Sequence, residues 1–196
     1  MYNLSAELAD MAARHIAEEG LSYAQAKRKA AKQAGVGEHS ASMPDNVVIE
    51  AALRSYLSEH YGDSQPALLA QLRQTALKWM VLIEGLSAEE VHARCLATGA
   101  IVNGTATQWS AVHLQICTDD SKFLEMALLN RGFDIDATEQ SIAGQMRPVM
   151  VVHDDGLPIV LTILPASDYR PKLASSHSVQ QVANIAKLQA LCTEVI

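Results

Sequence analysis

The first eighty-five residues place apolar side chains with the period of an α-helix. Apolar residues recur three and four positions apart over residues 4–16, and Gly20 supplies a helix end. Ser22 is a suitable N-cap for a second helix over Tyr23–Ala34, which Gly35 closes. The pattern therefore predicts two consecutive helices, each ended by a glycine.

Two further helices are predicted before the pattern changes. Residues 35–45 are rich in Gly, Ser and Pro and predict a loop, after which helical spacing resumes over Val47–Tyr61. Pro66 suits the first turn of a fourth, strongly apolar helix over Ala67–Ile83. The N-terminal part of the chain is thus expected to be all-helical.

Beyond residue 85 the hydrophobic period changes from that of a helix to that of a strand. Over Ser110–Cys117, apolar Val112 and Leu114 alternate with His113 and Gln115, as in a half-buried strand. Residues 92–102 also suggest a strand, although "SAEEVHARC" fits a capped helix equally well. The other expected elements are a helix over Asp119–Asn130, a strand over Asp134–Ile142, a hairpin over residues 149–164 turning near Asp155-Gly156, and a final helix capped by Ser178.

These elements predict an α+β protein. A helical N-terminal region over residues 1–62 is followed, over residues 66–196, by a small mixed-sheet region that ends in a helix. The 196 residues are 49% hydrophobic, enough to fill a sizeable core. The sequence shows no internal repeat and no low-complexity tract.

The charge and the cysteine content limit the functional classes to which the protein can belong. A net charge of −7 argues against a general polyanion-binding surface but leaves a local basic patch open. Three widely spaced cysteines do not predict a disulfide scaffold and fit a reducing compartment. No apolar run approaches the roughly 18 residues of a membrane-spanning helix. We therefore expect a cytoplasmic protein without a membrane partner.

The segment "ATGAIVNGTATQWSAVHLQI", residues 97–116, carries the main chemical signal. Glycine lets backbone N–H groups approach a phosphate closely, although ordinary turns use glycine too. Gly99-Ala100, then Gly104-Thr105, then the run from Ser110 to Leu114 resembles the nucleotidyltransferase superfamily of the polymerase-beta type. Members carry a Gly-Ser pair, a second Gly, and Ser-Asp-x-Asp-Leu on the next strand. The resemblance covers roughly residues 66 to 165.

The resemblance implies a metal site that this sequence does not provide. Residues two positions apart on a strand point to the same face of the sheet. The resemblance therefore implies that the family's two aspartates share divalent ions, which bridge a triphosphate. Those positions are Ala111 and His113 here, and the serine of the first pair is Ala100. Neither alanine nor a neutral imidazole suits Mg²⁺, which prefers oxygen ligands. We therefore expect a degenerate, non-catalytic member without cofactor that keeps a cleft for a nucleotide or phosphate ligand; its binding residues are Gly99, Gly104, Thr105, Ser110 and His113.

A first alternative is an active nucleotidyltransferase with relocated carboxylates. Asp134 and Asp136 repeat the Asp-x-Asp spacing on the next predicted strand and are the rescue candidates for catalysis. Mg²⁺ is expected only under this alternative. A solvated strand face explains the same two residues equally simply.

A second alternative is a nucleic-acid-binding regulator that uses the second helix. The run "AARHIAEEGLSYAQAKRKAAKQAGV" is similar to the start of tetracycline-repressor-type regulators, although the following proline-bearing loop and the predicted strands depart from that family. Lys27, Arg28, Lys29 and Lys32 would contact phosphates, or simply form a solvated basic helix. Trp109 is expected to pack over the helices or to stack on a base. A protein partner or a homo-oligomer stays open.

Overall fold

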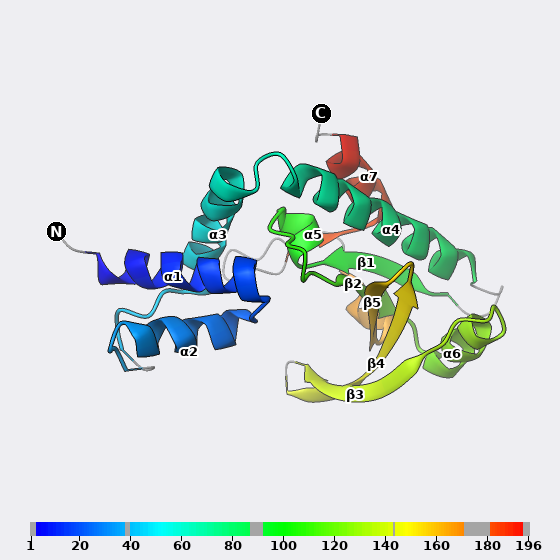
Figure 1. The fold of residues 1–196 in the computed structure, drawn as a ribbon. Helices are drawn as coiled ribbons and strands as arrows, with labels where there is room; N and C mark the ends of the chain where they lie inside the picture. The colour runs from blue at the N-terminus through cyan, green and yellow to red at the C-terminus, as the bar shows by residue number, and fades with distance from the viewer. Residues whose placement is uncertain (1–2, 38–39, 87–91, 143, 171–180, 194–196) are drawn as a thin grey trace. The chain divides into compact units, whose positions relative to one another are not determined.

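The computed structural model describes residues 3–37, 40–86, 92–142, 144–170 and 181–193 (Figure 1). It confirms the α+β class, because helices and a six-stranded mixed sheet are both present in the described residues. The helices are α1 Leu4–Glu19, α2 Tyr23–Gln33, α3 Asn46–His60, α4 Gln65–Gly85, α5 Ala100–Asn103, α6 Ser121–Leu129 and α7 Ile185–Thr193, with a 3₁₀ turn at Ala166–Asp168. The strands are β1 Arg94–Thr98, β2 Val112–Cys117, β3 Asp136–Ile142, β4 Gln145–Asp154, β5 Leu157–Leu164 and β6 Val182–Ala183.

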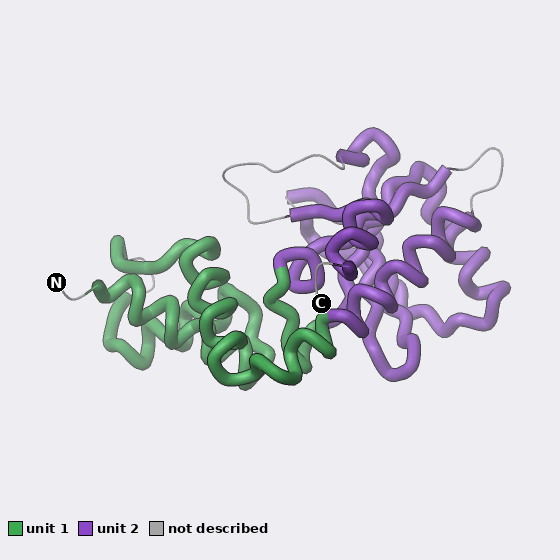
Figure 2. Tube along the Cα trace, turned by 90° about the horizontal axis from the view of Figure 1, so that it is seen from above, with its two compact units in different colours: residues 1–69, 104–110 green, residues 70–103, 111–196 purple. Residues whose placement is uncertain are grey.

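The chain forms two compact units (Figure 2). Unit 1 comprises residues 1–69 and 104–110, and unit 2 comprises residues 70–103 and 111–196. The division falls inside α4, whereas the sequence pattern predicts a break between residues 62 and 66. The loop that follows α5 belongs to the helical unit although both of its neighbours in sequence belong to the sheet unit.

Capping residues fix the ends of the first three helices, and Gly20 and Ser22 do so where the sequence predicts. Gly20 follows α1 in the left-handed conformation, with φ +68°. Ser22 accepts a hydrogen bond from the Gln25 backbone N–H, and the Gln25 side chain accepts one from the Ser22 N–H, which completes a capping box. The Asp45 side chain caps α3 by accepting a hydrogen bond from the Val48 N–H.

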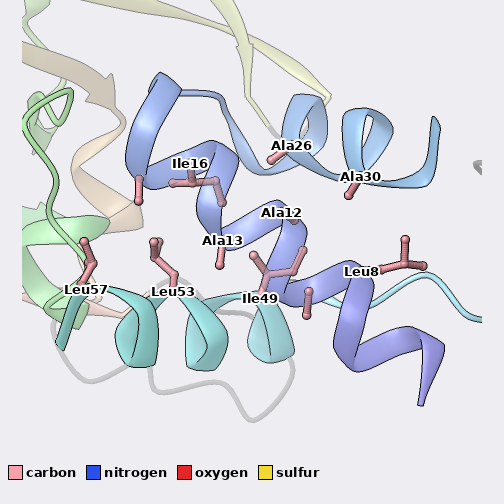
Figure 3. Packing of buried hydrophobic residues seen from close by; sticks show 11 residues of the cluster. Leu8, Ala12, Ala13, Ile16, Ala26, Ala30, Ile49, Leu53 and Leu57 are labelled. Atoms are coloured by element: carbon pink, nitrogen blue, oxygen red, sulfur yellow. The ribbon is translucent and has the colours of Figure 1, made fainter. Parts of the chain in front are cut away.

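The core of unit 1 lies between α1 and its two neighbours. Small residues such as Ala12 and Ala13 on α1 let α2 and α3 approach closely (Figure 3). Ile49 and Leu53 of α3 point toward α1 and are at most 1% exposed. Burying such side chains stabilises each by roughly 1.5–3 kcal/mol relative to exposure.

The sheet of unit 2 has the strand order β3-β4-β5-β2-β1-β6. Strand β2 runs antiparallel to β1 and parallel to β5, and all other pairs are antiparallel. One face of the sheet is buried, as Met150, Leu161 and Leu114, which lie in one row, show by exposures of 3% or less. Helices α4 and α7 lie beside each other near β1 (Figure 1). The opposite face, which carries His113, is only partly covered.

The structure confirms the hairpin and corrects three boundaries. Asp155 and Gly156 both have positive φ, and they turn β4 into β5 as predicted. The strand expected over residues 92–102 begins at Arg94 and stops at Thr98, because the chain turns at Gly99 into α5. The final helix begins at Ile185 and follows the unpredicted strand β6, whereas Ser178 lies outside the described residues.

None of the described helices is both long enough and apolar enough to span a membrane.

Candidate functional site

The turn between β1 and α5 places the first glycine of the predicted site. Gly99 has φ +72°, a conformation that glycine adopts without strain. A side chain there would meet no atom within 4 Å, so the backbone conformation and not space accounts for the glycine. Its carbonyl accepts hydrogen bonds from the N–H groups of Val102 and Asn103 at 2.9 and 3.1 Å, which starts α5. The turn is thus part of unit 2 and is held by its own backbone.

Strand β2 brings His113 next to this turn. Thr98, the residue before Gly99, lies directly opposite His113 in the antiparallel ladder, and the Thr98 hydroxyl lies 3.5 Å from the His113 carbonyl oxygen. Because the ladder is antiparallel, Gly99, one residue after Thr98, lies beside Val112, one residue before His113. Both residues belong to unit 2. The resemblance predicts this meeting of a glycine turn and the strand after it.

The His113 imidazole is suited to hydrogen bonding and not to holding a hard cation. Its side chain is exposed on the open face of the sheet, yet the surrounding protein desolvates it and lowers its pKa below 6.5. It is therefore neutral at pH 7, with one nitrogen that donates and one that accepts. A neutral ring offers a bound ligand one N–H donor and carries no positive charge.

The neighbours of His113 carry no carboxylate. Thr98 on β1 and Val160 on β5 lie directly opposite it, and Ala111 precedes it on the same face. Within the described ranges, no group of three or more His, Cys, Asp or Glu side chains lies close enough to hold a metal ion. Burial raises the pKa of Cys117, further along β2, to about 11, so its thiol is protonated at pH 7.

The two rescue aspartates lie far from β2. Both Asp134 and Asp136 are exposed, and Asp136 begins β3 at the edge of the sheet. Asp136 shares a row with His113, but β4 and β5 separate their strands, with Val151 and Val160 in between. Three strand spacings correspond to roughly 14 Å. Strands β2 and β3 are consecutive in the sequence but are not neighbours in the sheet. The strand order therefore separates Asp136 from His113.

The remaining predicted ligand residues belong to the helical unit. Gly104 has φ +81° and its carbonyl accepts a hydrogen bond from the Gln65 side-chain amide at 3.0 Å. Thr105 also belongs to unit 1 and is only 3% exposed. The Ser110 hydroxyl accepts the Thr107 N–H at 2.9 Å and so holds the loop. The described structure thus groups Gly99 with His113 and places the other three residues in unit 1.

The basic residues of α2 are not equivalent. Arg28, Lys29 and Lys32 line one open groove of unit 1, because positions 28 and 32 are one helical turn apart. Lys27 is not among the residues that line it. The consecutive Lys27, Arg28 and Lys29 are expected to fan around the helix, and of these three Arg28 and Lys29 line the same groove.

One buried charged residue close to the Gly99 turn has no counterpart among the residues that the sequence predicts. Arg73, on α4, is 4% exposed, and its guanidinium donates to the carbonyls of Ile101 at 2.8 Å and Leu191 at 2.7 Å. It therefore connects α4 to α5, directly after the Gly99 turn, and to α7. The available signal is the single arginine of this helix, a residue type that is rarely buried without partners.

Comparisons with known proteins add a weak likeness. No protein-family model and no curated protein matches the chain. One similar solved structure is a cytoplasmic RNA terminal U-transferase, with 18% identity and a TM-score of 0.37 over 48% of this chain and 28% of that chain. Another is Cid1 in complex with the UTP analog UMPNPP, with 13% identity and a TM-score of 0.40 over 58% of this chain and 36% of that chain. The chain spans only 28% and 36% of these two structures, and likenesses at this level show neither its family nor its function.

Proposed function

We propose that the protein is a nucleotidyltransferase-like protein of the polymerase-beta type that binds a nucleotide or another phosphate ligand without carrying out metal-dependent transfer. The observation that carries the proposal is the meeting of the Gly99 turn with His113 across the β1–β2 ladder. This is the place where the resemblance expects a glycine turn and a pair of metal ligands.

The chemistry of the two ligand positions supports binding without transfer. Ala111 offers no oxygen, and His113 has a neutral imidazole where the family carries a carboxylate. Val160 and Thr98, opposite His113, supply no replacement carboxylate. A divalent ion that bridges two phosphates needs such oxygens, whereas a phosphate can bind to N–H donors alone.

The same geometry argues against the relocated-carboxylate alternative. Two side chains that share one ion must each reach within about 2.0–2.6 Å of it. Asp136 lies three strand spacings from β2, so it and His113 cannot meet at one ion in this sheet. We therefore place the ligand at the Gly99 turn and not at β3.

Thermal unfolding with each nucleoside triphosphate, with and without Mg²⁺, tests the proposal. A ligand that binds only the folded protein stabilises it by about 2.7 kcal/mol at a hundredfold excess over Kd, which raises Tm. We expect a shift that does not need Mg²⁺ and that decreases in His113→Ala. His153→Ala, an exposed histidine on β4, is the matched control and should keep the full shift.

Two results would decide against it. A shift that requires Mg²⁺ and disappears in Asp134→Asn or Asp136→Asn would establish the relocated site instead. The absence of a shift with every nucleotide and with inorganic phosphate would remove the ligand-binding function altogether.

A further inference from the structure

Helix α2 presents an open groove whose lining is basic and amide-rich. The groove has a volume of about 960 Å³ and belongs entirely to unit 1. The helix carries four basic side chains and no acidic one, in a protein with a net charge of −7. We call this surface the α2 groove; its lining residues are Leu21, Gln25, Arg28, Lys29, Lys32, Gln33, Val36 and Gly37.

The cations of the α2 groove are spaced along one face of the helix. Arg28 and Lys32 lie one turn apart, about 6 Å along the axis, which is close to the spacing of neighbouring phosphates in an extended single strand. Both side chains are exposed, and in the described part of the chain no carboxylate forms an ion pair with either. Their charge is therefore available to an anion from outside.

A polar network holds the other side of the groove. Lys29 Nζ donates to both carboxylate oxygens of Glu19, at 2.7 and 2.5 Å. The buried His15 ring links Glu19, at 2.7 Å from Nδ1, to the Gln33 side-chain oxygen, at 2.9 Å from Nε2. Glu19 thus neutralises Lys29 and orders two lining side chains, which leaves Arg28 and Lys32 as the anion-binding pair.

An exposed aromatic ring, that of Trp109, packs on Gly20, the residue that precedes the α2 groove in the sequence. Trp109 is 56% exposed, although it packs so closely on Gly20 that a methyl group there would come within 2.7 Å of its ring. Gly20 adjoins Leu21, the first residue of the groove, and all three belong to unit 1. Trp109 therefore has one face supported by Gly20 and much of its surface open to a planar partner.

We infer that the α2 groove and Trp109 bind a single-stranded nucleic acid, whose phosphates lie against Arg28 and Lys32 and one of whose bases stacks on Trp109. Basic side chains along a groove, combined with an aromatic platform, are the features by which proteins bind single strands without strong sequence preference. No side chain of α2 is among the large exposed apolar residues of the described chain, which argues against a membrane surface as the partner. This inference concerns unit 1 and does not depend on nucleotide binding at Gly99.

Affinity for a fluorescein-labelled 12-mer of oligouridylate, measured by anisotropy over a range of salt concentrations, tests the phosphate contacts. Arg28→Gln and Lys32→Gln should each weaken binding and lower the slope of log K against log[salt] by about 0.7, the loss of one phosphate contact to a single strand. Lys27→Gln removes the same charge from the same helix outside the groove and should leave the slope unchanged. Glu19→Gln should tighten binding, because it frees Lys29.

Tryptophan fluorescence tests the stacking contact. The chain has two tryptophans, and Trp79 is 1% exposed, so quenching by an added strand reports on Trp109. We expect oligouridylate and oligothymidylate to quench the emission, with a duplex of equal length quenching far less. Trp109→Leu should abolish the quenching and weaken single-strand affinity about fivefold or more.

Each of three results would overturn the inference. They are an equal loss of affinity in Lys27→Gln and Arg28→Gln, displacement of the strand by polyglutamate at the same charge concentration, and the absence of binding at low salt. An unchanged nucleotide-induced Tm shift in the groove variants would show that the two sites are separate. Failure at the α2 groove is thereby distinguished from failure of the proposed function at Gly99.

Discussion

At the scale of single residues, Gly20 has two reasons to be glycine, and each can be measured. It adopts φ +68°, and an added Cβ would come within 2.7 Å of the Trp109 ring. The left-handed conformation costs a non-glycine residue roughly 1–2 kcal/mol, and overpacking adds about 1–3 kcal/mol. We predict that Gly20→Ala lowers the free energy of unfolding by about 2–4 kcal/mol in urea titrations followed by circular dichroism.

Gly35 supplies the matched control for this prediction. It has nearly the same φ, +67°, but an added side chain would meet no atom within 4 Å. Gly35→Ala should therefore cost only the conformational part, about 1–2 kcal/mol. When Trp109 is already replaced by alanine, Gly20→Ala should cost no more than Gly35→Ala, because the ring that the added Cβ would meet is absent. Equal costs in the two single glycine variants would contradict the contact between Gly20 and Trp109.

At the scale of elements, Arg73 connects three helices of unit 2. Hydrogen bonds from its side chain, which is 4% exposed, reach carbonyls in α5 and α7. A lysine cannot reproduce the planar guanidinium, and a buried carbonyl left without a donor costs about 1–3 kcal/mol. We predict that Arg73→Lys destabilises unit 2 by about 2–4 kcal/mol and lowers amide-exchange protection in α5 and α7.

Hydrogen exchange also provides the control for Arg73. Arg14→Lys, on α1, changes an exposed arginine and should alter stability by less than about 0.5 kcal/mol. Protection in α1 to α3 should be the same in Arg73→Lys as in the wild type. Loss of protection in α1 to α3 alone would mean that Arg73 does not act through α5 and α7.

The elements also show which features the sequence can predict. Helix caps and the Asp155-Gly156 turn depend on a few neighbouring residues, so their positions follow from local chemistry. The pairing of β2 with β5 joins residues nearly fifty positions apart and has no local signature. For this reason the sequence predicts the Gly99 turn and the His113 strand but not the distance of Asp136 from them. The two-residue strand β6 is likewise too short to show a pattern.

At the scale of the whole molecule, the described residues of each unit include a carboxylate whose pKa is lowered by its hydrogen-bond partners. Hydrogen bonds from Lys29 first, and then from His15, lower the pKa of Glu19 below 4.5 in unit 1. In unit 2, Lys78 at 2.8 Å and the Trp79 indole N–H at 2.8 Å lower the pKa of Asp154 below 3.8. A carboxyl with a lowered folded-state pKa contributes stability above its unfolded-state pKa and loses it as the pH falls through the folded-state value.

Lowering the pH should therefore destabilise the two units through different carboxylates, Glu19 in unit 1 and Asp154 in unit 2. We predict that Tm falls progressively below about pH 4.5, where Glu19 begins to bind protons in the unfolded chain, and falls further below about pH 3.8 through Asp154. Glu19→Gln should lower Tm at pH 7 and flatten the upper part of this decline, while Asp154→Asn should flatten the lower part. Glu59→Gln, an exposed position on α3, is the control. If Glu19→Gln and Asp154→Asn have the same pH profile as Glu59→Gln, neither ion pair contributes to folding, and the ordering of Lys29 in the α2 groove has to come from another contact.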